Sequence, residues 1–389
     1  MKKSQKFFIV LALLFPLLAC SNSGKGGGGH VDPPDPPIPP DPPKVHHIVA
    51  TSPVDNGLLS LAGDDVTEFV ENYTFALSSD YVTNYDHYQT KESVTLTWEA
   101  QEAANYYLVE LSSYEDLSES NVYLTNEESV EVSGLLPGKY YYWRVNAYYD
   151  TKIIQSYTFT FETRGIPQAI YLDTVKNLRD LGGMITSDNK RIKDGMVFRG
   201  ANPDSVSDSD KNYMVNELGI KTEIELRNLD EGQRNKLGVQ NCVTISDNGG
   251  FYYDNVPNGV SYASGRAALV KELRYFADAN NYPIYFHCAI GRDRTGSLAA
   301  VLLCLLGVSK KDMCIDYEMS MFALASTADI RSGLCTVLDL VNQLFTIYNY
   351  IYGGYTGATM KEKTEAFLLD NGMTQQEIDS IRNILLEDR

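Results

Sequence analysis

His-Cys-Ala-Ile-Gly-Arg-Asp-Arg-Thr-Gly, residues 287 to 296, is the segment that decides the fold of this chain. The short apolar run Pro283 to His287 precedes it and predicts a buried strand, and the apolar run Thr295 to Leu306 follows it and predicts a helix. Further expected elements are a strand at 219–226 and helices at 263–279, 310–326, 330–350 and 359–387, the last broken near 371–372. Strands alternating with helices predict an α/β domain with a central sheet and added C-terminal helices.

The loop between this strand and helix is suited to attack on a phosphate monoester. A thiolate takes up a phosphoryl group well when a helix N-terminus lowers its pKa, and Cys288 stands at that position. Arg294 closes the loop with a fork that fits phosphate oxygens, and the hydroxyl of Thr295 is placed to hydrogen-bond the sulfur. The backbone N–H groups expected to wrap around the anion belong to Ala289, Ile290, Gly291 and Arg292.

Two glycines of the loop have expected structural tasks. Gly291 is expected to let the backbone turn inward, and Gly296 to let the helix start close to the sheet. The alternative without function is a buried cysteine and an unrelated surface arginine. It does not account for a cysteine, an arginine and two glycines at this spacing between a strand and a helix.

The segment resembles the loop of the cysteine-based protein-tyrosine phosphatase superfamily. Within it, the closest likeness is the bacterial tyrosine phosphatase family, whose loop reads HCxxGKDRTG and whose domain opens with NxRDLGG, as residues 177–183 do here. The resemblance spans about 170 to 388, with further matches at 198–199, 225–227, 316–320 and 371–386. It implies that Cys288 is the nucleophile, that Arg294 binds phosphate and that Asp293 is the general acid.

Several roles stay open at this level. Arg292 stands where the family often has a lysine associated with activity on phosphoinositides. Asp254, 34 residues before Cys288, is the alternative acid by likeness to the wider superfamily, with Asp247 a weaker one. Asp293 could instead only hold Arg292 or the loop backbone. Arg179 and Asp180 of the opening motif could contact substrate, but an internal ion pair that braces the loop is favoured. Arg199 and Arg227 could each face either substrate or interior.

The N-terminus predicts export and a lipid anchor. Lys2, Lys3 and Lys6 precede an apolar run that ends in Leu-Leu-Ala-Cys at 17–20, which resembles the lipobox of bacterial lipoproteins. We therefore expect a signal peptide at 1–19 and a lipid on Cys20. Ser21 favours the outer membrane by resemblance to known sorting patterns. A Gly/Pro-rich stalk at 20–44 is expected to act as a semi-rigid spacer.

Residues 45–164 alternate in hydrophobicity and predict an all-β domain. The spacing of Pro137, Tyr141, Trp143 and Val145, together with Trp98, resembles a fibronectin type III sandwich with its tyrosine corner. Residues 63–92 are expected to be an insertion. A spacer role is favoured over a binding module, and the remainder, 165–389, is the expected catalytic domain.

Composition and charge narrow the partners. A net charge of −18 argues against nucleic acid, because that contact needs a basic face. No metal ligand set is apparent, and no cofactor is expected. Cys304 is expected to be a small buried hydrophobe, and a Cys314–Cys335 disulfide is left open.

The resemblance implies an active phosphatase. Its expected partners are phosphorylated proteins, or phosphorylated lipids or inositol phosphates, besides the membrane that holds Cys20. The alternative is a surface binding lipoprotein whose phosphatase-like domain is catalytically silent. Inactive relatives usually lose the cysteine or the arginine, and this chain keeps both Cys288 and Arg294.

Overall fold

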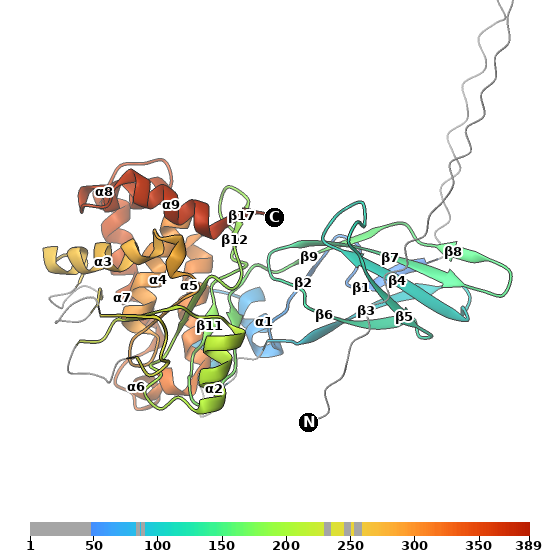
Figure 1. Ribbon diagram of the computed structural model, residues 1–389, viewed down its shortest axis with the longest axis horizontal. Coiled ribbons are helices and arrows are strands. Elements are labelled where there is room, and N and C mark those ends of the chain that lie inside the picture. Colours follow the sequence, from blue (N-terminus) through green and yellow to red (C-terminus); the bar gives the residue numbers. More distant parts are fainter. Residues whose placement is uncertain (1–47, 83–85, 87–89, 229–234, 245–249, 253–258) are drawn as a thin grey trace, which may run out of the picture. The chain divides into compact units, whose positions relative to one another are not determined.

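The computed structural model describes residues 48–82, 86, 90–228, 235–244, 250–252 and 259–389. The expected signal peptide, stalk, Cys20, Asp247 and Asp254 therefore lie outside the described residues. The chain from His46 to Arg389 forms one compact unit (Figure 1). Within the described part of the chain, no helix is both long and apolar enough to cross a bilayer.

The first half of this unit contains two sheets. One has the order β1 (Ile48–Ser52), β3 (Ser93–Ala100), β6 (Ser129–Ser133). The other has the order β2 (Gly57–Leu59), β9 (Phe159–Thr163), β7 (Tyr140–Tyr148), β4 (Tyr106–Ser112), β5 (Asn121–Thr125), and β8 (Ile153–Gln155) pairs with β7. Because alternate side chains of a strand point to one face, the alternating pattern of the sequence produces a shared core around Trp98 and Trp143.

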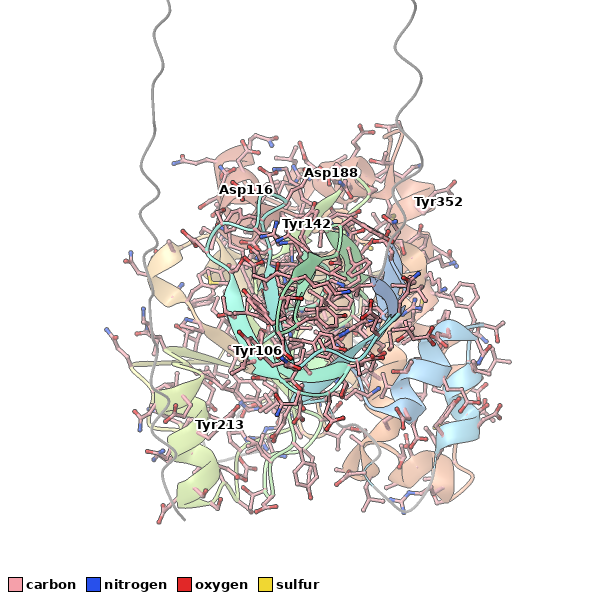
Figure 2. All side chains as sticks on the ribbon, turned by 90° about the vertical axis from the view of Figure 1, so that its right-hand side faces the viewer. Tyr106, Asp116, Tyr142, Asp188, Tyr213 and Tyr352 are labelled. Atoms are coloured by element: carbon pink, nitrogen blue, oxygen red, sulfur yellow. The ribbon has the colours of Figure 1, made fainter. Side chains whose placement is uncertain are left out.

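The β region contains two well-defined tyrosine contacts. The hydroxyl oxygen of Tyr141 accepts a hydrogen bond of 2.8 Å from the backbone N–H of Leu136, which is the geometry expected of a tyrosine corner. Outside the core, the exposed ring of Tyr106, labelled in Figure 2, stacks on Tyr148 with ring centroids 4.6 Å apart.

The all-β expectation for 45–164 is wrong for the expected insertion. A helix, α1 (Asp64–Glu71), and a 3₁₀ turn, η1 (Leu77–Tyr81), occupy it. Their apolar residues pack with residues from the second half of the chain into one cluster, because a short amphipathic helix needs a partner surface. The members of this cluster include Val66, Phe69, Val70, Ile315, Met319, Phe322 and Ala323.

The second half is built on a six-stranded sheet. Its order is β10 (Gln168–Ala169), β11 (Arg179–Asp180), β13 (Val197–Gly200), β16 (Ile284–His287), β14 (Thr222–Glu225), β15 (Asn241–Thr244). The four strands from β13 to β15 run parallel, and β10 and β11 are antiparallel additions. The α/β prediction is thus confirmed, with β16 in the middle of the sheet, fully buried.

Helices surround this sheet. They are α2 (Asp208–Asn212), which continues into the π-helical turn η2 (Tyr213–Glu217), α3 (Ala263–Phe276), η3 (Ala279–Asn281), α4 (Asp293–Leu306), α5 (Lys310–Met319), α6 (Ala328–Arg331), α7 (Val337–Gly354), α8 (Met360–Asp370) and α9 (Gln375–Leu385). The apolar helix α4 contacts α3, α5, α7 and α8, which accounts for its burial on nearly all sides (Figure 1).

Two predicted helix boundaries need correction. The expected helix 310–326 ends at Met319 and continues as two 3₁₀ turns, η4 (Ser320–Phe322) and η5 (Leu324–Ser326). The expected helix 330–350 is two helices, because Gly333 adopts a positive φ of 75° and Thr336 starts α7 with a capping box to Asp339. The expected break near 371–372 is confirmed between α8 and α9.

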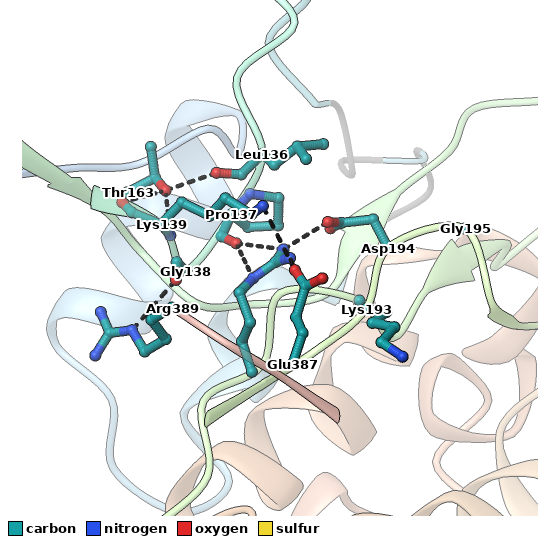
Figure 3. A network of polar contacts seen from close by, with 12 residues as sticks. Leu136, Pro137, Gly138, Lys139, Thr163, Lys193, Asp194, Gly195, Glu387 and Arg389 are labelled. Atoms are coloured by element: carbon teal, nitrogen blue, oxygen red, sulfur yellow. Dashed lines mark hydrogen bonds and ion pairs between the residues drawn. The ribbon is translucent and has the colours of Figure 1, made fainter. Parts of the chain in front are cut away.

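A polar network joins the β region to the second half (Figure 3). The side chain of Arg191, which is fully buried on β12 (Lys190–Ile192), donates twice to the carbonyl oxygen of Pro137, at 3.1 and 2.7 Å. Its charge is balanced by Asp194 at 2.6 Å and by Glu387 on β17 (Leu386–Asp388), the partner strand of β12. A simple spacer would not need a buried arginine, so these contacts argue against the spacer interpretation.

Candidate active site

The loop singled out by the sequence lies between β16 and α4. Cys288 follows the last residue of β16 and is 4% exposed, and α4 begins at Asp293. The segment from Cys288 to Arg292 therefore ends on the N-terminus of a long helix, whose free N–H groups attract an anion. Arg294 lies in the first turn of this helix and is partly exposed.

The backbone of the loop is turned by partners on its outer side. Three consecutive carbonyl groups accept hydrogen bonds from outside the loop: Ala289 from Asn202 (2.7 Å), Ile290 from Asn177 (3.0 Å) and Ser326 (2.9 Å), and Gly291 from Arg199 (2.9 Å). In a trans peptide the N–H points opposite to the C=O. The N–H groups of Ile290, Gly291 and Arg292 are therefore directed to the inner side, where they can bind a tetrahedral anion.

The two loop glycines are explained by close packing. Gly291 has a φ of 72°, and a Cβ there would lie 2.4 Å from the carbonyl oxygen of Gly200 at the end of β13. At Gly296 a Cβ would lie 2.7 Å from the ring of Tyr317. The expectation that Gly296 brings the helix close to the sheet is thus corrected, because its nearest contact is with helix α5.

The opening motif braces the loop, but not through the pair expected from the sequence. Arg179 does not pair with Asp180. It binds Asp316 at 2.8 Å, and Asp180 accepts the N–H groups of Gly182 (2.8 Å) and Gly195 (2.5 Å). Neighbouring residues on a strand point to opposite faces, which is why the two side chains cannot meet. Burial raises the pKa of Asp180 to about 7, against the effect of the two N–H groups.

Asp316 connects this motif to the loop. Its carboxylate, 1% exposed, binds Arg179 through one oxygen and Arg199 through the other, and Arg199 in turn holds the carbonyl of Gly291. Burial opposes ionisation, but the two arginines keep the pKa of Asp316 below its usual value. Arg199 therefore supports the loop from the protein interior, on the outer side of the loop, and corresponds to the interior-facing alternative for this residue.

A second buried network includes His287, the residue before Cys288, and side chains of β14. Arg227 binds Asp204 with two bonds of 2.7 and 2.8 Å and Glu225 with bonds of 2.6 and 2.9 Å. His287 contacts Glu223 through its Nε2 atom at 3.0 Å. Burial opposes protonation of His287, but the contact with Glu223 and the charge of Glu225 raise its pKa. Arg227 is thus also engaged in the interior.

Arg292 and Asp293 form an ion pair with each other. The guanidinium of Arg292, 4% exposed, donates to Asp293 (2.8 Å), to Asp329 (2.7 Å) and to the carbonyl of Ser326 (2.6 Å). The hydrogen bond from Arg292 lowers the pKa of Asp329 to about 2. An arginine suits this position because it can make several bonds in one plane, which a lysine cannot. The contact between Asp293 and Arg292 matches the bracing alternative for Asp293.

Two other expectations concern Thr295 and the cysteines. The hydroxyl of Thr295 is buried in the first turn of α4 and, within the described part of the chain, has no hydrogen-bond partner, so the expected bond to the sulfur is not present here. Cys314 and Cys335 are free rather than joined. Cys304 is buried in the apolar core and contacts the sulfur of Met313, as expected of a small hydrophobe.

Sequence reasoning missed several residues around the loop. Asn202, Ser326 and Asp329 carry no local signal, because they reach the loop only through the tertiary fold. Tyr252 is a further one. Its ring lies under the guanidinium of Arg294, 5.9 Å from the centroid, and burial together with the charges of Asp293 and Cys288 raises its pKa.

Comparisons with known proteins identify the family of the second half of the chain. The model of the tyrosine phosphatase family matches residues 170–387. A protein of Cupriavidus necator, provisionally named a tyrosine-protein phosphatase, is 26% identical over 172 residues, which cover 37% of this chain. The match spans 60% of that relative's length.

Two solved structures were also found. The core catalytic domain of the PP-IP phosphatase SIW14 from S. cerevisiae, in complex with citrate, has 21% identity and a TM-score of 0.26, over 32% of this chain and 71% of that chain. The structure of PTPMT1 in complex with PI(5)P has 17% identity and a TM-score of 0.24, over 46% of this chain and 96% of that chain.

Proposed function

The chain belongs to the tyrosine phosphatase family and is a phosphatase, and from this premise we propose that it hydrolyses phosphate monoesters through a cysteinyl-phosphate intermediate on Cys288. The observation that carries the proposal is the loop from Cys288 to Arg294, whose carbonyls are held from outside so that its N–H groups converge on the inner side. The alternative, a silent binding lipoprotein, has no comparable support.

The reaction follows from this geometry in two steps. The thiolate of Cys288 attacks phosphorus, so that an S–P bond forms while the bond from phosphorus to the ester oxygen breaks. The loop N–H groups and Arg294 bind the three non-bridging oxygens, and a general acid protonates the leaving oxygen. Water then attacks phosphorus, the S–P bond breaks, and the water proton passes to the conjugate base of that acid, which releases inorganic phosphate.

For the substrate we propose phosphotyrosine ahead of phosphoinositides or inositol phosphates. Several phosphate groups need several available cations. The side chain of Arg292 contacts both Asp293 and Asp329, so that its charge is already balanced. The test is a panel of phosphotyrosine peptides, phosphoinositides and phytate. Higher kcat/KM on the peptides supports the proposal, preference for phytate reverses the substrate order, and no turnover of any member contradicts the phosphatase itself.

The general acid remains a choice between Asp293 and Asp254, and we propose Asp293. It stands in the loop beside Arg294, although the structure also gives it the bracing contact with Arg292. An alkyl phosphate needs protonation of its leaving group more than an aryl phosphate does. We expect Asp293→Asn to remove the basic limb of the pH–rate profile and to lower kcat for an alkyl phosphate by about 10²-fold, and that for an aryl phosphate less.

The matched variant for this test is Asp254→Asn. Both variants should be measured over the same pH range with the same aryl and alkyl substrates. If Asp254→Asn loses the basic limb while Asp293→Asn keeps it, the acid is Asp254, and Asp293 is a brace for Arg292.

We further propose that the protein is an exported lipoprotein of the outer membrane, anchored through Cys20, with a fibronectin type III-like domain at 45–164. The lipobox-like run ending at Cys20 motivates the anchor. Cys20→Ala should move the protein from the membrane to the soluble fraction, as immunoblots of the two fractions would reveal. Unchanged membrane association of this variant would contradict a lipid anchor on Cys20.

A further inference from the structure

Glu272 is a buried carboxyl group on α3 close to the candidate active site. It is 0% exposed, and its Oε1 atom accepts a hydrogen bond of 2.7 Å from the backbone N–H of Phe251. Within the described residues its Oε2 atom has no hydrogen-bond partner. Burial raises the pKa of Glu272 to about 8, against the hydrogen bond from Phe251 and the charge of Arg294, which lower it. A buried carboxyl with one unmet oxygen is costly, which points to a task beyond packing.

The residues next to Glu272 form a short strip that leads to the site. A Cβ on Gly250 would lie 2.6 Å from Oε1 of Glu272, so any larger residue here would displace the Glu272 carboxyl group. The N–H of Gly250 donates to the carbonyl of Leu226 at 2.7 Å. The Nη1 atom of Arg294 donates to that same carbonyl at 3.3 Å. One carbonyl oxygen therefore joins the strip to the phosphate-binding arginine.

Tyr252 completes the connection. It follows Phe251 directly, and the guanidinium of Arg294 lies 5.9 Å from the centroid of its ring. A planar cation held over an aromatic face has a preferred orientation. Arg294 thus contacts the strip at the ring of Tyr252, and it shares the carbonyl of Leu226 as an acceptor with the N–H of Gly250. The position of the ring depends on where the backbone of Phe251 lies, and Glu272 holds the N–H of Phe251.

We propose that Glu272 is a positioning residue for Arg294. By accepting the N–H of Phe251 it fixes the strip Gly250–Tyr252, and the strip orients the guanidinium for phosphate. This inference rests on the proposed function, in which Arg294 binds the phosphate of the substrate. Glu272 itself does not contact the reacting atoms. Its loss should therefore weaken phosphate binding through Arg294 rather than remove the nucleophile.

The test uses Glu272→Ala and Glu272→Gln in the full chain at pH 7. The readouts are KM and kcat for p-nitrophenyl phosphate and the inhibition constant of vanadate, a phosphate analogue that Arg294 would bind. Glu272→Ala should raise the vanadate constant and KM by roughly tenfold or more, since small misplacements at a site cost this much. Glu272→Gln keeps an oxygen acceptor for the N–H of Phe251 and the shape of the side chain, and should stay within about threefold of the wild type.

Two further variants separate positioning from general loss of stability. Leu273→Ala makes a cavity in the core one residue further along α3, and should leave the vanadate constant within about threefold. Gly250→Ala places a Cβ against Glu272 and should raise the constant as Glu272→Ala does, which keeps the test decisive if Glu272→Ala does not fold.

The outcomes are distinct. A vanadate constant within about twofold of the wild type in both Glu272→Ala and Gly250→Ala overturns the inference while the proposed function stands. An equal rise of the vanadate constant in Leu273→Ala also overturns the inference, because the effect would then not be specific to Glu272. If the wild-type chain neither turns over the substrate nor binds vanadate, the proposed function itself fails and the inference fails with it.

Discussion

Replacement of Cys288 by serine is expected to abolish turnover of p-nitrophenyl phosphate while binding of phosphate or vanadate persists. A serine hydroxyl is not ionised near neutral pH, so the variant lacks the nucleophile that forms the S–P bond. The N–H groups that bind phosphate should keep their orientation in this variant. The loop carbonyls are held by Asn202, Asn177 and Arg199, and these hydrogen bonds do not involve the sulfur of Cys288. We expect kcat to fall by about 10⁴-fold or more.

The measurement is steady-state turnover, with vanadate binding followed by calorimetry in the same preparations. Cys242→Ser is a matched control, since Cys242 lies on β15, outside the loop. It should keep the activity of the wild type. A Cys288→Ser chain that retains more than about a hundredth of the activity would require another nucleophile.

The loop of the candidate active site could be predicted from the sequence because its signal is local. Composition alone predicts a strand at Pro283 to His287 and a helix at Thr295 to Leu306. The segment from Cys288 to Arg294 lies between these two elements. The structure places β16 and α4 within two residues of these bounds. The β strands of the first half were predictable for the same reason, since alternation within one strand is read without its neighbours.

The partners of the charged residues could not be predicted, because they come from distant parts of the chain. Arg179 and Asp180 are adjacent in sequence and suggested a pair, yet Arg179 binds Asp316, 137 positions further on. Arg292 similarly takes Asp329 from α6 as a partner, which the spacing within the loop does not indicate. Local sequence patterns predict where helices and strands occur. The ion pairs of the interior depend on which of these elements pack together, which local patterns do not predict.

The packing of the insertion at 63–92 could not be predicted from its sequence. The segment lacks the alternation of the surrounding strands, which indicates an insertion but not what it contacts. In the structure α1 and η1 supply one side of a buried apolar cluster whose other side, Ile315, Met319 and Phe322, belongs to the second half of the chain. The pattern of an amphipathic eight-residue helix such as α1 indicates that its apolar face is buried, but it does not indicate which surface covers that face.

Removal of everything before residue 166 is therefore expected to destabilise the catalytic domain, where a spacer would predict no effect. Glu318 on α5 is 0% exposed, and four donors from the removed segment satisfy its carboxylate. These are the hydroxyl of Tyr73 (2.8 Å), the N–H of Ala76 (2.9 Å), and the N–H (3.1 Å) and hydroxyl (2.7 Å) of Ser78. The truncation also uncovers Ile315, Met319 and Phe322 of the shared apolar cluster, and burying each such side chain contributes about 1.5–3 kcal/mol to the unfolding free energy.

The same truncation should reach the active site through α5. Glu318 is two residues from Asp316, which holds Arg179 and Arg199, and Arg199 holds the carbonyl of Gly291 in the catalytic loop. We expect the chain 166–389 to have kcat/KM on p-nitrophenyl phosphate at least about tenfold below that of 46–389, since a small displacement of the loop is costly. Urea denaturation and steady-state kinetics of the two chains measure both effects.

A point variant isolates the contact from the loss of a whole domain. Ser78→Ala in the chain 46–389 removes one of the four donors and should lower the unfolding free energy by about 1–3 kcal/mol, because the oxygen it served is buried. Val122→Ala, at an exposed position on β5, is the matched control and should change it by less than about 0.5 kcal/mol. If 166–389 matches 46–389 in both stability and kcat/KM, the β region is a spacer after all, and the contacts of Glu318 with Tyr73, Ala76 and Ser78 contribute nothing to the catalytic fold.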